Sequence, residues 1–162
     1  EDLATLRQLP AFGRLMKNAA MVKTIRAVYP TITYPNHTSM RTGTYCGKHG
    51  ILNNEKTILT QEHSDWEWFQ DAVKIGDIFD AAKAAGLSTA AVFWPVTGNH
   101  PHIDYLVDEY WPQSVDETTE ECFAASGSSP DVIEHVIRPN RHLLDGKHRQ
   151  HPVMKAAYSA RW

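Results

Sequence analysis

The sequence has few cysteines, no excess of positive charge and no long apolar run. Its two cysteines, Cys46 and Cys122, are too few for a disulfide framework and lack the close pairing of a zinc knuckle. We expect two ordinary free thiols, which are compatible with a reducing cytoplasm. The net charge of -3 provides no broad cationic surface, so the sequence argues against a nucleic-acid polymer as partner.

No window of the sequence approaches the ~18 uninterrupted apolar residues that cross a membrane. Residues 1 to 20 also lack the basic start and apolar core of a leader. Because the sequence starts with Glu1 and not with Met, a leader removed earlier stays an open alternative. With 162 residues, of which 42% are hydrophobic and 22% charged, the chain is expected to bury a core as an ordinary globular domain.

Two elements are expected at the start of the chain. Apolar positions recur every three or four residues from Leu3 to Asn18, which predicts a helix with an irregularity at Pro10. Met21 to Tyr29 is apolar and β-branched enough for a strand, and Pro30 should end it.

The middle of the chain alternates between helix and strand patterns. A short helix is expected over Pro35 to Thr42, followed by Gly43 and by a loop over Tyr45 to Gln61. Then comes the best helical face, which Gly86 closes and which consists of Ile75, Ile78, Phe79, Ala82 and Ala85. A buried strand is expected over Ser88 to Trp94 and a second, short strand over Ile103 to Val107. This alternation predicts an α/β sandwich with a largely parallel sheet flanked by helices.

The last third of the chain is more polar. The acidic run from Asp116 to Glu121 is typical of a solvated loop or a helix start, and Ser126 to Pro130 of a linker or helix cap. Two helices are expected after it, over Pro130 to Ile137 and Pro152 to Trp162, with the polar segment Arg138 to His151 between them.

One motif carries a functional signal. Between Val28 and Asn54 the sequence contains, in order, Thr33-Tyr34-Pro35-Asn36-His37, Thr42-Gly43, His49-Gly50-Ile51 and Asn54. This array resembles the strand, Thr-aromatic-Pro-Asn-His turn, helix, Thr-Gly pair, later His-Gly-Ile and closing Asn of the type I phosphodiesterase / nucleotide pyrophosphatase family of the alkaline phosphatase superfamily. Phe93-Trp94-Pro95 adds a weaker similarity.

The resemblance implies a role for three residues. Thr33 would bind zinc and attack phosphorus, which gives a phospho-threonine intermediate that water hydrolyses. A threonine hydroxyl needs such help, since it is a poor nucleophile at neutral pH. Asn54 would donate its amide hydrogens to a phosphoryl oxygen, and Tyr34 would bind substrate by lining the leaving-group or nucleoside pocket.

Each role has a structural alternative. Thr33 could be an N-cap hydroxyl, Asn54 a turn residue and Tyr34 a packing aromatic. His37 and His49 belong to the motif, and we expect them to brace the loop through hydrogen bonds rather than to bind metal.

The family resemblance also implies two zinc ions. Their other ligands are an Asp at the end of the first strand, an Asp-X-X-X-His pair, an Asp-His pair and a further His, and none has a match in residues 1–162. The pair His100 and His102 and the group His142, His148 and His151 lack regular zinc spacing, so solvated loops are expected there. This chain alone is therefore expected to bind no stoichiometric zinc at Thr33.

Residues 1–162 are thus interpreted as the N-terminal part of a catalytic domain that acts on a small phosphodiester or nucleotide. A phosphonate hydrolase of the phosphonoacetate type is the enzymatic alternative, and a metal-free, non-catalytic fragment is the other. The resemblance places the family's first strand before Glu1, so an uncovered sheet edge or core face and self-association are expected.

Overall fold

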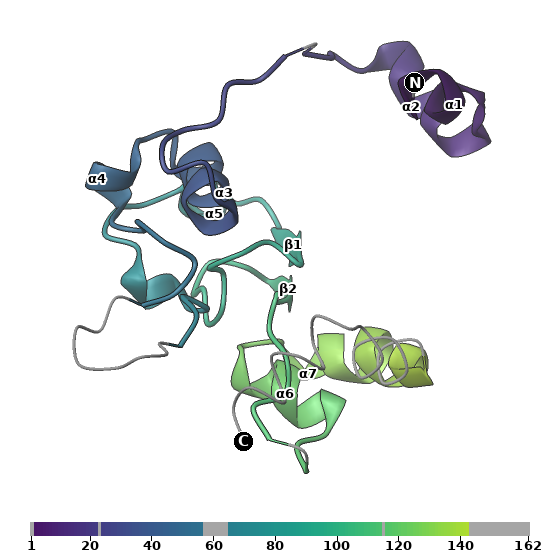
Figure 1. Cartoon of the computed structure of the whole chain (residues 1–162). Helices are drawn as coiled ribbons and strands as arrows, with labels where there is room; N and C mark the ends of the chain where they lie inside the picture. The colour runs from purple at the N-terminus through teal and green to yellow at the C-terminus, as the bar shows by residue number, and fades with distance from the viewer. Residues whose placement is uncertain (1, 23, 57–64, 115, 143–162) are drawn as a thin grey trace.

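The computed structural model describes residues 2–22, 24–56, 65–114 and 116–142, which form short helices around a small sheet (Figure 1). The sheet has two strands. In chain order the elements are α1 (Asp2–Gln8), α2 (Pro10–Asn18), α3 (Thr33–Thr42), α4 (Cys46–His49), η1 (Gln70–Ala72), α5 (Ile78–Ala84), β1 (Ala90–Val92), β2 (Tyr105–Val107), α6 (Thr119–Ala125), α7 (Pro130–Val132), η2 (Ile133–Ile137) and η3 (Arg138–Asn140).

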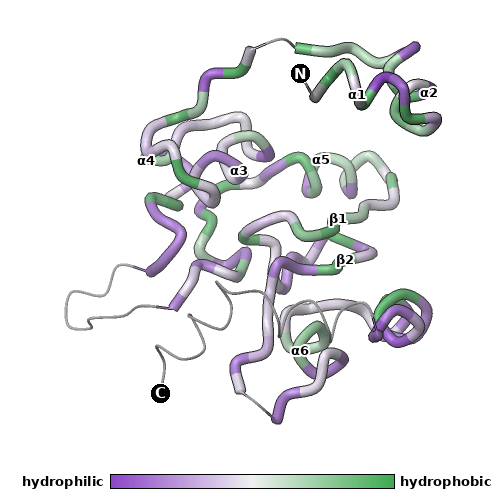
Figure 2. Tube along the Cα trace, turned by 45° about the vertical axis from the view of Figure 1, so that its right-hand side comes forward, coloured by the Kyte–Doolittle hydropathy of each residue, from purple (hydrophilic) through white to green (hydrophobic). Residues whose placement is uncertain are grey.

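The N-terminal helix is broken where the sequence predicted an irregularity. Leu9 has an extended backbone, and Pro10 begins α2, where a missing backbone N–H costs little. No residue of α2 is buried, and the apolar residues along this helix pair are shown in green in Figure 2. The helix pair stands apart from the other labelled elements in Figures 1 and 2.

The predicted strand over Met21 to Tyr29 is wrong for the part of that segment that the structure describes. Residues 21, 22 and 24–29 form an extended connection without strand pairing. Val22 and Ile25 are 70% and 74% exposed, so β-branched composition alone does not produce a strand without a neighbour to pair with.

The helix after this connection starts earlier than predicted. α3 begins at Thr33 rather than at Pro35, and it ends as expected before Gly43, whose φ is 66°. At that angle a side chain would be strained, which explains a glycine at this position. A short helix, α4, lies in the segment expected to be a loop.

The central helix and strands appear in the predicted order but are short. β1 and β2 pair in parallel, with Ala90 opposite Tyr105 and Val92 opposite Val107. The predicted largely parallel sandwich is thus present as a two-stranded parallel sheet in the described part of the chain. The apolar face of α5 was expected to pack into the core, and it does not. No residue of α5 is buried, and Ile78 is 61% exposed.

Two hydrophobic clusters form the core. The first contains Tyr34, Ile51, Trp68 and Val96, and the second contains Val107, Phe123, Val132 and Ile137. Cys46 and Cys122 are both free and buried, as predicted for ordinary thiols.

The acidic run ends at a helix start, which was one of its two predicted readings. Thr118 caps α6 and forms a capping box with Glu121. The helix expected over Pro130 to Ile137 is split into α7 and the π-helical turn η2. The helix expected over Pro152 to Trp162 lies outside the described residues. None of the helices that the structure describes is long and apolar enough to cross a membrane.

Candidate active site

Thr33 is the first residue of α3 and is exposed. The residue before it, Ile32, occupies the N-cap position, and its side chain makes no capping hydrogen bond. The Thr33 hydroxyl therefore does not act as an N-cap, which was its structural alternative. Pro35 has no N–H, and the N–H groups of Tyr34 and Asn36 are bound to Asn54 Oδ1 and to the Ile32 carbonyl. The Thr33 N–H and the positive end of the helix dipole remain at this turn to attract a phosphoryl oxygen.

Asn54 lies beside Thr33 although 20 positions separate it from Tyr34. Its Oδ1 accepts a hydrogen bond of 2.8 Å from the backbone N–H of Tyr34. A bridge between Glu55 and Trp66 and a 2.8 Å bond from the Glu67 N–H to the Asn54 carbonyl fix this backbone. Among the described residues no acceptor binds the Asn54 Nδ2 hydrogens, so they can serve a ligand at the start of α3.

The two histidines of the motif brace the structure, as predicted. His37 Nδ1 lies 2.8 Å from the Thr33 carbonyl oxygen, and its ring meets Trp94 edge to face at 5.4 Å. His49 is fully buried, and its Nδ1 accepts the Ile51 N–H. Its Nε2 therefore carries the proton and donates to the hydroxyl of Ser39 at 2.9 Å. Burial and the charge of Arg41 lower the pKa of His49, which keeps the ring neutral.

Tyr34 is fully buried, which corresponds to its packing alternative. Its ring contacts Trp66 and Trp68 edge to face, with centroids 5.4 and 6.4 Å apart. Contact between Tyr34 and a substrate stays a prediction. Burial, helped by the nearby carboxyl of Glu109, raises the pKa of the Tyr34 hydroxyl, so the hydroxyl stays protonated.

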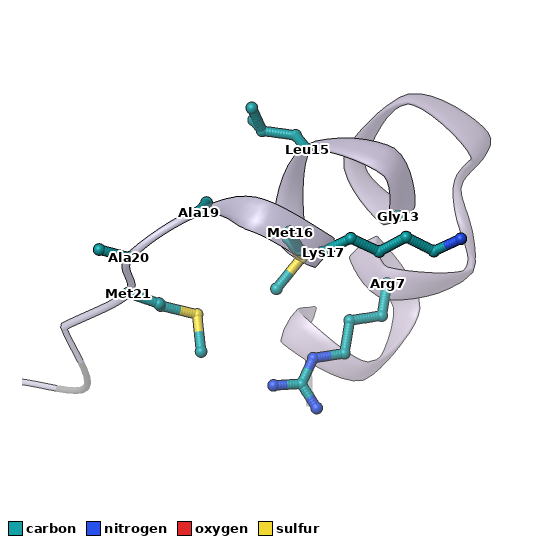
Figure 3. A pocket seen from close by; sticks show the side chains of 8 residues that line it. All are labelled: Arg7, Gly13, Leu15, Met16, Lys17, Ala19, Ala20 and Met21. Carbon is teal, nitrogen blue, oxygen red and sulfur yellow. The ribbon is translucent and has the colours of Figure 1, made fainter.

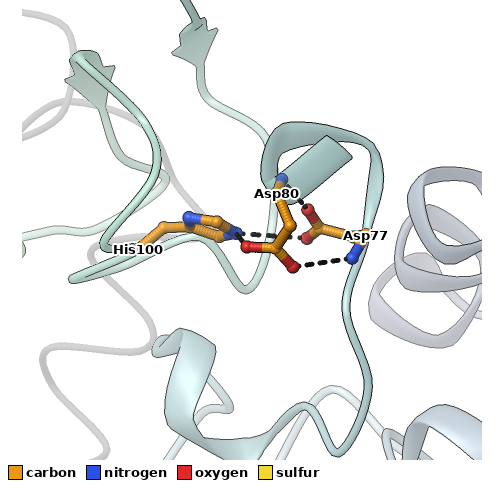
Figure 4. Close-up of side chains that lie close together, drawn as sticks. All are labelled: Asp77, Asp80 and His100. Atoms are coloured by element: carbon orange, nitrogen blue, oxygen red, sulfur yellow. Dashed lines mark hydrogen bonds and ion pairs between the residues drawn. The ribbon is translucent and has the colours of Figure 1, made fainter. Parts of the chain in front are cut away.

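A group of candidate metal ligands lies elsewhere, at the start of α5. Asp77, Asp80 and His100 each bring one ligand atom within 4.8 Å of the others (Figure 4). Within the described part of the chain no comparable group surrounds Thr33.

The atoms of this group are already engaged. Asp77 Oδ1 accepts the N–H groups of Phe79 and Asp80, and the Asp77 N–H donates to Asp80 Oδ2, which makes a capping box. His100 Nδ1 accepts the His102 N–H, so His100 Nε2 carries a proton and points it at Asp77 Oδ2, 3.2 Å away. This donor set fits a hydrogen-bonded cap better than a metal ion, which needs free lone pairs.

The same network corrects the expectation for the histidines. His100 is 5% exposed and part of the core, so the solvated loop expected for it is wrong. His102 and His142 are exposed, and His148 and His151 lie outside the described residues.

A buried ion pair connects α3 to α5. Arg41 Nη1 lies 3.4 Å from Asp77 Oδ2, and both side chains are almost inaccessible to solvent. Burial alone would raise the pKa of Asp77, but the His100 hydrogen bond and the Arg41 charge hold it below its usual value. The ion pair therefore connects α3, which begins at Thr33, to the N-cap of α5.

Two hollows of the surface lie away from Thr33. A cavity of about 420 Å³ in the N-terminal helix pair is lined by Leu15, Met16 and Met21, with Arg7 and Lys17 at its edge (Figure 3). A second cavity, of about 290 Å³, lies between the extended connection and α3, where Asn36 and Met40 line it. Neither is lined by Thr33 or Asn54.

The predictions from the sequence did not include a role for Asp77 and Asp80. Their spacing, an acidic residue at the N-cap and another three positions later, is a capping-box signal that was available in the sequence. The partnership of Asp77 with Arg41 and His100 has no such local signal.

Comparison with known proteins adds to this geometry. The sequence model of the type I phosphodiesterase / nucleotide pyrophosphatase family matches residues 1–157. The chain is 34% identical over 96 residues to ectonucleotide pyrophosphatase/phosphodiesterase family member 1 of Homo sapiens, which covers 54% of this chain and 10% of that relative. It is 31% identical over 109 residues to family member 3 of Rattus norvegicus, covering 59% and 12%. It is 33% identical over 114 residues to the venom phosphodiesterase of Naja atra, covering 64% and 14%.

Proposed function

Since the chain belongs to the type I phosphodiesterase / nucleotide pyrophosphatase family, we propose that the protein hydrolyses phosphodiester or pyrophosphate bonds through a phospho-threonine at Thr33. The substrate class is a small phosphodiester or a nucleotide, and residues 1–162 form the N-terminal part of the catalytic domain. The chain spans 10% to 14% of the length of the three relatives compared above, so the activity of the whole protein belongs to this proposal.

One observation carries the proposal: the hydrogen bond from the Tyr34 N–H to Asn54 Oδ1. It brings the amide of Asn54 to the same helix start as the exposed hydroxyl of Thr33. A nucleophile and a hydrogen-bond donor for the developing charge are needed on one phosphoryl group, and this turn supplies both.

In the reaction, the Thr33 hydroxyl gives up its proton and its oxygen forms a bond to phosphorus, while the bond from phosphorus to the leaving alcohol or phosphate breaks and the leaving group takes up a proton. Water then attacks the phospho-threonine and releases the second product. The Asn54 Nδ2 and the backbone N–H of Thr33 bind the non-bridging oxygens in both steps.

Two zinc ions, with Thr33 as one ligand, also belong to the proposal. Zinc would supply the acidity that turns a threonine hydroxyl into a nucleophile. The described residues place no set of further ligands around Thr33, and the ligand atoms of the group at Asp77 are already engaged in hydrogen bonds.

The test is replacement of Thr33 in the intact protein, with hydrolysis of a nitrophenyl phosphodiester as the assay. Thr33→Ala should lower kcat by at least about a thousandfold, because the covalent step has no other nucleophile. Thr33→Ser should keep part of the activity and should yield a phosphoryl adduct on the peptide that carries position 33. Thr44→Ala, which removes a threonine hydroxyl beyond the end of α3, is the matched control and should remain active.

Near-normal hydrolysis by Thr33→Ala would overturn the nucleophile assignment. Hydrolysis of phosphonoacetate, with no turnover of the phosphodiester, would favour the phosphonate hydrolase instead.

A further inference from the structure

Asn36 lies near the start of α3, and its side chain binds the connection that enters this helix. Its Oδ1 accepts a hydrogen bond of 2.8 Å from the Val28 N–H. Its Nδ2 donates to the carbonyl oxygens of Pro30 at 3.0 Å and of Ile32 at 2.8 Å. Because an amide nitrogen has two hydrogens, both donors of this side chain are used on the backbone just before Thr33.

The bond to Ile32 fixes the peptide unit that carries the Thr33 N–H. The Ile32 carbonyl and the Thr33 N–H belong to one planar group, and this peptide bond is trans, so the two point in opposite directions. The Asn36 backbone N–H also donates to the Ile32 oxygen, at 3.3 Å. Two donors of Asn36 therefore hold the carbonyl side of this unit, and the Thr33 N–H points out of the N-terminal end of α3.

The next peptide unit is held by other groups. The Thr33 carbonyl oxygen lies 2.8 Å from His37 Nδ1, and the Tyr34 N–H donates to Asn54 Oδ1. The unit between Thr33 and Tyr34 is thus fixed without Asn36. A change at Asn36 should therefore alter the direction of the Thr33 N–H and leave Asn54 in place.

We propose that Asn36 is a positioning residue for phosphoryl binding, because it holds the peptide unit between Ile32 and Thr33 so that the Thr33 N–H points at a non-bridging oxygen. The inference deepens the proposed function and rests on it, since the turn that Asn36 holds is the one assigned to catalysis. The bond from Nδ2 to Ile32 is exposed and the other two are partly buried. Their loss should loosen the local backbone without unfolding the core.

Two variants separate the two sides of this amide. Asn36→Asp keeps an acceptor for the Val28 N–H but loses both donors, and Asn36→Ala loses all three bonds without adding a charge. Asn140→Asp is the matched control. Asn140 Nδ2 donates to the carbonyl of Val136, four residues earlier, at 2.7 Å, as Asn36 Nδ2 does to Ile32.

The first measurement is hydrolysis of a nitrophenyl phosphodiester by the intact protein. Both Asn36 variants should lower kcat by about ten- to a hundredfold with a change in KM of less than about threefold. A misdirected N–H weakens a bond that strengthens as charge develops on the phosphoryl oxygen, so the transition state is affected most. Agreement between the neutral and the charged variant excludes charge repulsion as the cause, and Asn140→Asp should match the wild type.

The second measurement distinguishes positioning from stability. Sulfur accepts hydrogen bonds weakly, so a phosphorothioate analogue of the same diester should react more slowly with the wild type. Both Asn36 variants have already lost the aimed N–H, and their ratio of oxygen to sulfur rates should be smaller. A smaller fraction of folded protein would lower both rates equally and leave this ratio unchanged.

Hydrogen exchange of the Val28 backbone amide provides a measurement without activity. Asn36→Ala should speed this exchange by about five- to tenfold, whereas Asn36→Asp should stay near the wild-type rate because it still accepts the Val28 N–H. The loss of kcat in Asn36→Asp then belongs to the Nδ2 donors alone.

Wild-type kcat in Asn36→Asp would overturn the inference, because the Nδ2 bonds would then contribute nothing to the reaction. A lowered kcat with an unchanged ratio of oxygen to sulfur rates would also overturn it and leave stability as the role of Asn36. If Thr33→Ala keeps full activity, the proposed function fails and the inference fails with it. If Thr33→Ala is inactive while both Asn36 variants match the wild type, only the inference fails.

Discussion

At the scale of single residues, the two polar atoms of the Asn54 amide have different roles, one observed and one proposed. Oδ1 accepts the Tyr34 N–H and so stabilises the fold, whereas Nδ2 is proposed to donate to a phosphoryl oxygen. A substitution that removes both atoms will mix the two effects, so the choice of replacement decides what is measured.

Asn54→Asp should separate these tasks. The carboxylate still accepts the Tyr34 N–H but can no longer donate to a phosphoryl oxygen, so stability should stay near the wild-type value. The value of kcat should fall by about a hundredfold to a thousandfold, the usual effect of losing one donor to a developing oxyanion. Asn54→Ala should lose a comparable factor in kcat and also unfold at a lower urea concentration. An unchanged kcat with only a raised KM in either variant would contradict the oxyanion role.

Asp108 is a second residue with a measurable consequence. Burial raises its pKa from 3.8 to about 7, so between these values the folded chain keeps a proton that the unfolded chain has lost. Stability falls with rising pH wherever the folded state binds more protons. This contribution is therefore complete at acid pH and is lost as the pH rises to about 7.

Asp108→Asn should remove this loss of stability with rising pH, because an amide does not ionise. It should raise the free energy of unfolding above about pH 7 by at most a few kcal/mol, since each pK unit corresponds to about 1.4 kcal/mol, and have little effect near pH 4. Urea unfolding at the two pH values measures it. Asp104→Asn is the control, and its effect on the free energy of unfolding should have the opposite sign. The hydrogen bond from Lys83 lowers the pKa of Asp104, so this carboxylate stabilises the fold when it is ionised. Equal destabilisation of Asp108→Asn at both pH values would contradict the prediction.

At the scale of elements, the two capping boxes within the described residues differ in the contacts that the capping side chain makes beyond the helix. The box at α5 uses Asp77, whose carboxylate also meets Arg41 and His100 in the interior. The box at α6 uses Thr118 and Glu121 and is partly exposed to solvent. The same local capping pattern is therefore expected to contribute more to the free energy of unfolding at α5 than at α6.

Asp77→Ala should destabilise the protein by about 3 to 5 kcal/mol, because it leaves the buried charge of Arg41 without its partner as well as removing the cap. Thr118→Ala, the matched cap without a buried ion pair, should cost about 1 kcal/mol. Denaturant unfolding compares the two. Equal losses would show that the Arg41 ion pair contributes nothing beyond the cap.

At the scale of the whole molecule, apolar surface remains uncovered at the N-terminal end. Leu15, Val22 and Ile25 are each more than 60% exposed, and α2 buries no residue. Exposed apolar patches of this kind favour association. Self-association of the chain, expected from the sequence, remains a prediction.

Residues 1–162 should therefore sediment as a species larger than a monomer, in a concentration-dependent way. Leu15→Lys combined with Ile25→Lys should shift the distribution towards the monomer, because a charge on each site opposes its burial. Leu52→Lys, at an exposed apolar residue away from the helix pair, is the control. A wild-type chain that stays monomeric at all concentrations would contradict the prediction.

The sequence by itself determined the features that depend on neighbouring residues. The break at Pro10, the end of α3 at Gly43 and the motif from Thr33 to Asn54 are local signals, because they reflect backbone sterics and fixed spacing. The bracing role of His37 and His49 followed from the same motif.

Only the tertiary structure decided which distant groups meet. The pairing of Asn54 with Tyr34, the burial of His100 and the ion pair between Arg41 and Asp77 each join separate segments. The segment from Met21 to Tyr29 shows the same dependence, since a strand forms only where another strand satisfies its backbone. Local sequence determines which hydrogen bonds and charges a side chain can offer. The fold determines which distant partner meets that side chain and therefore which of these interactions forms.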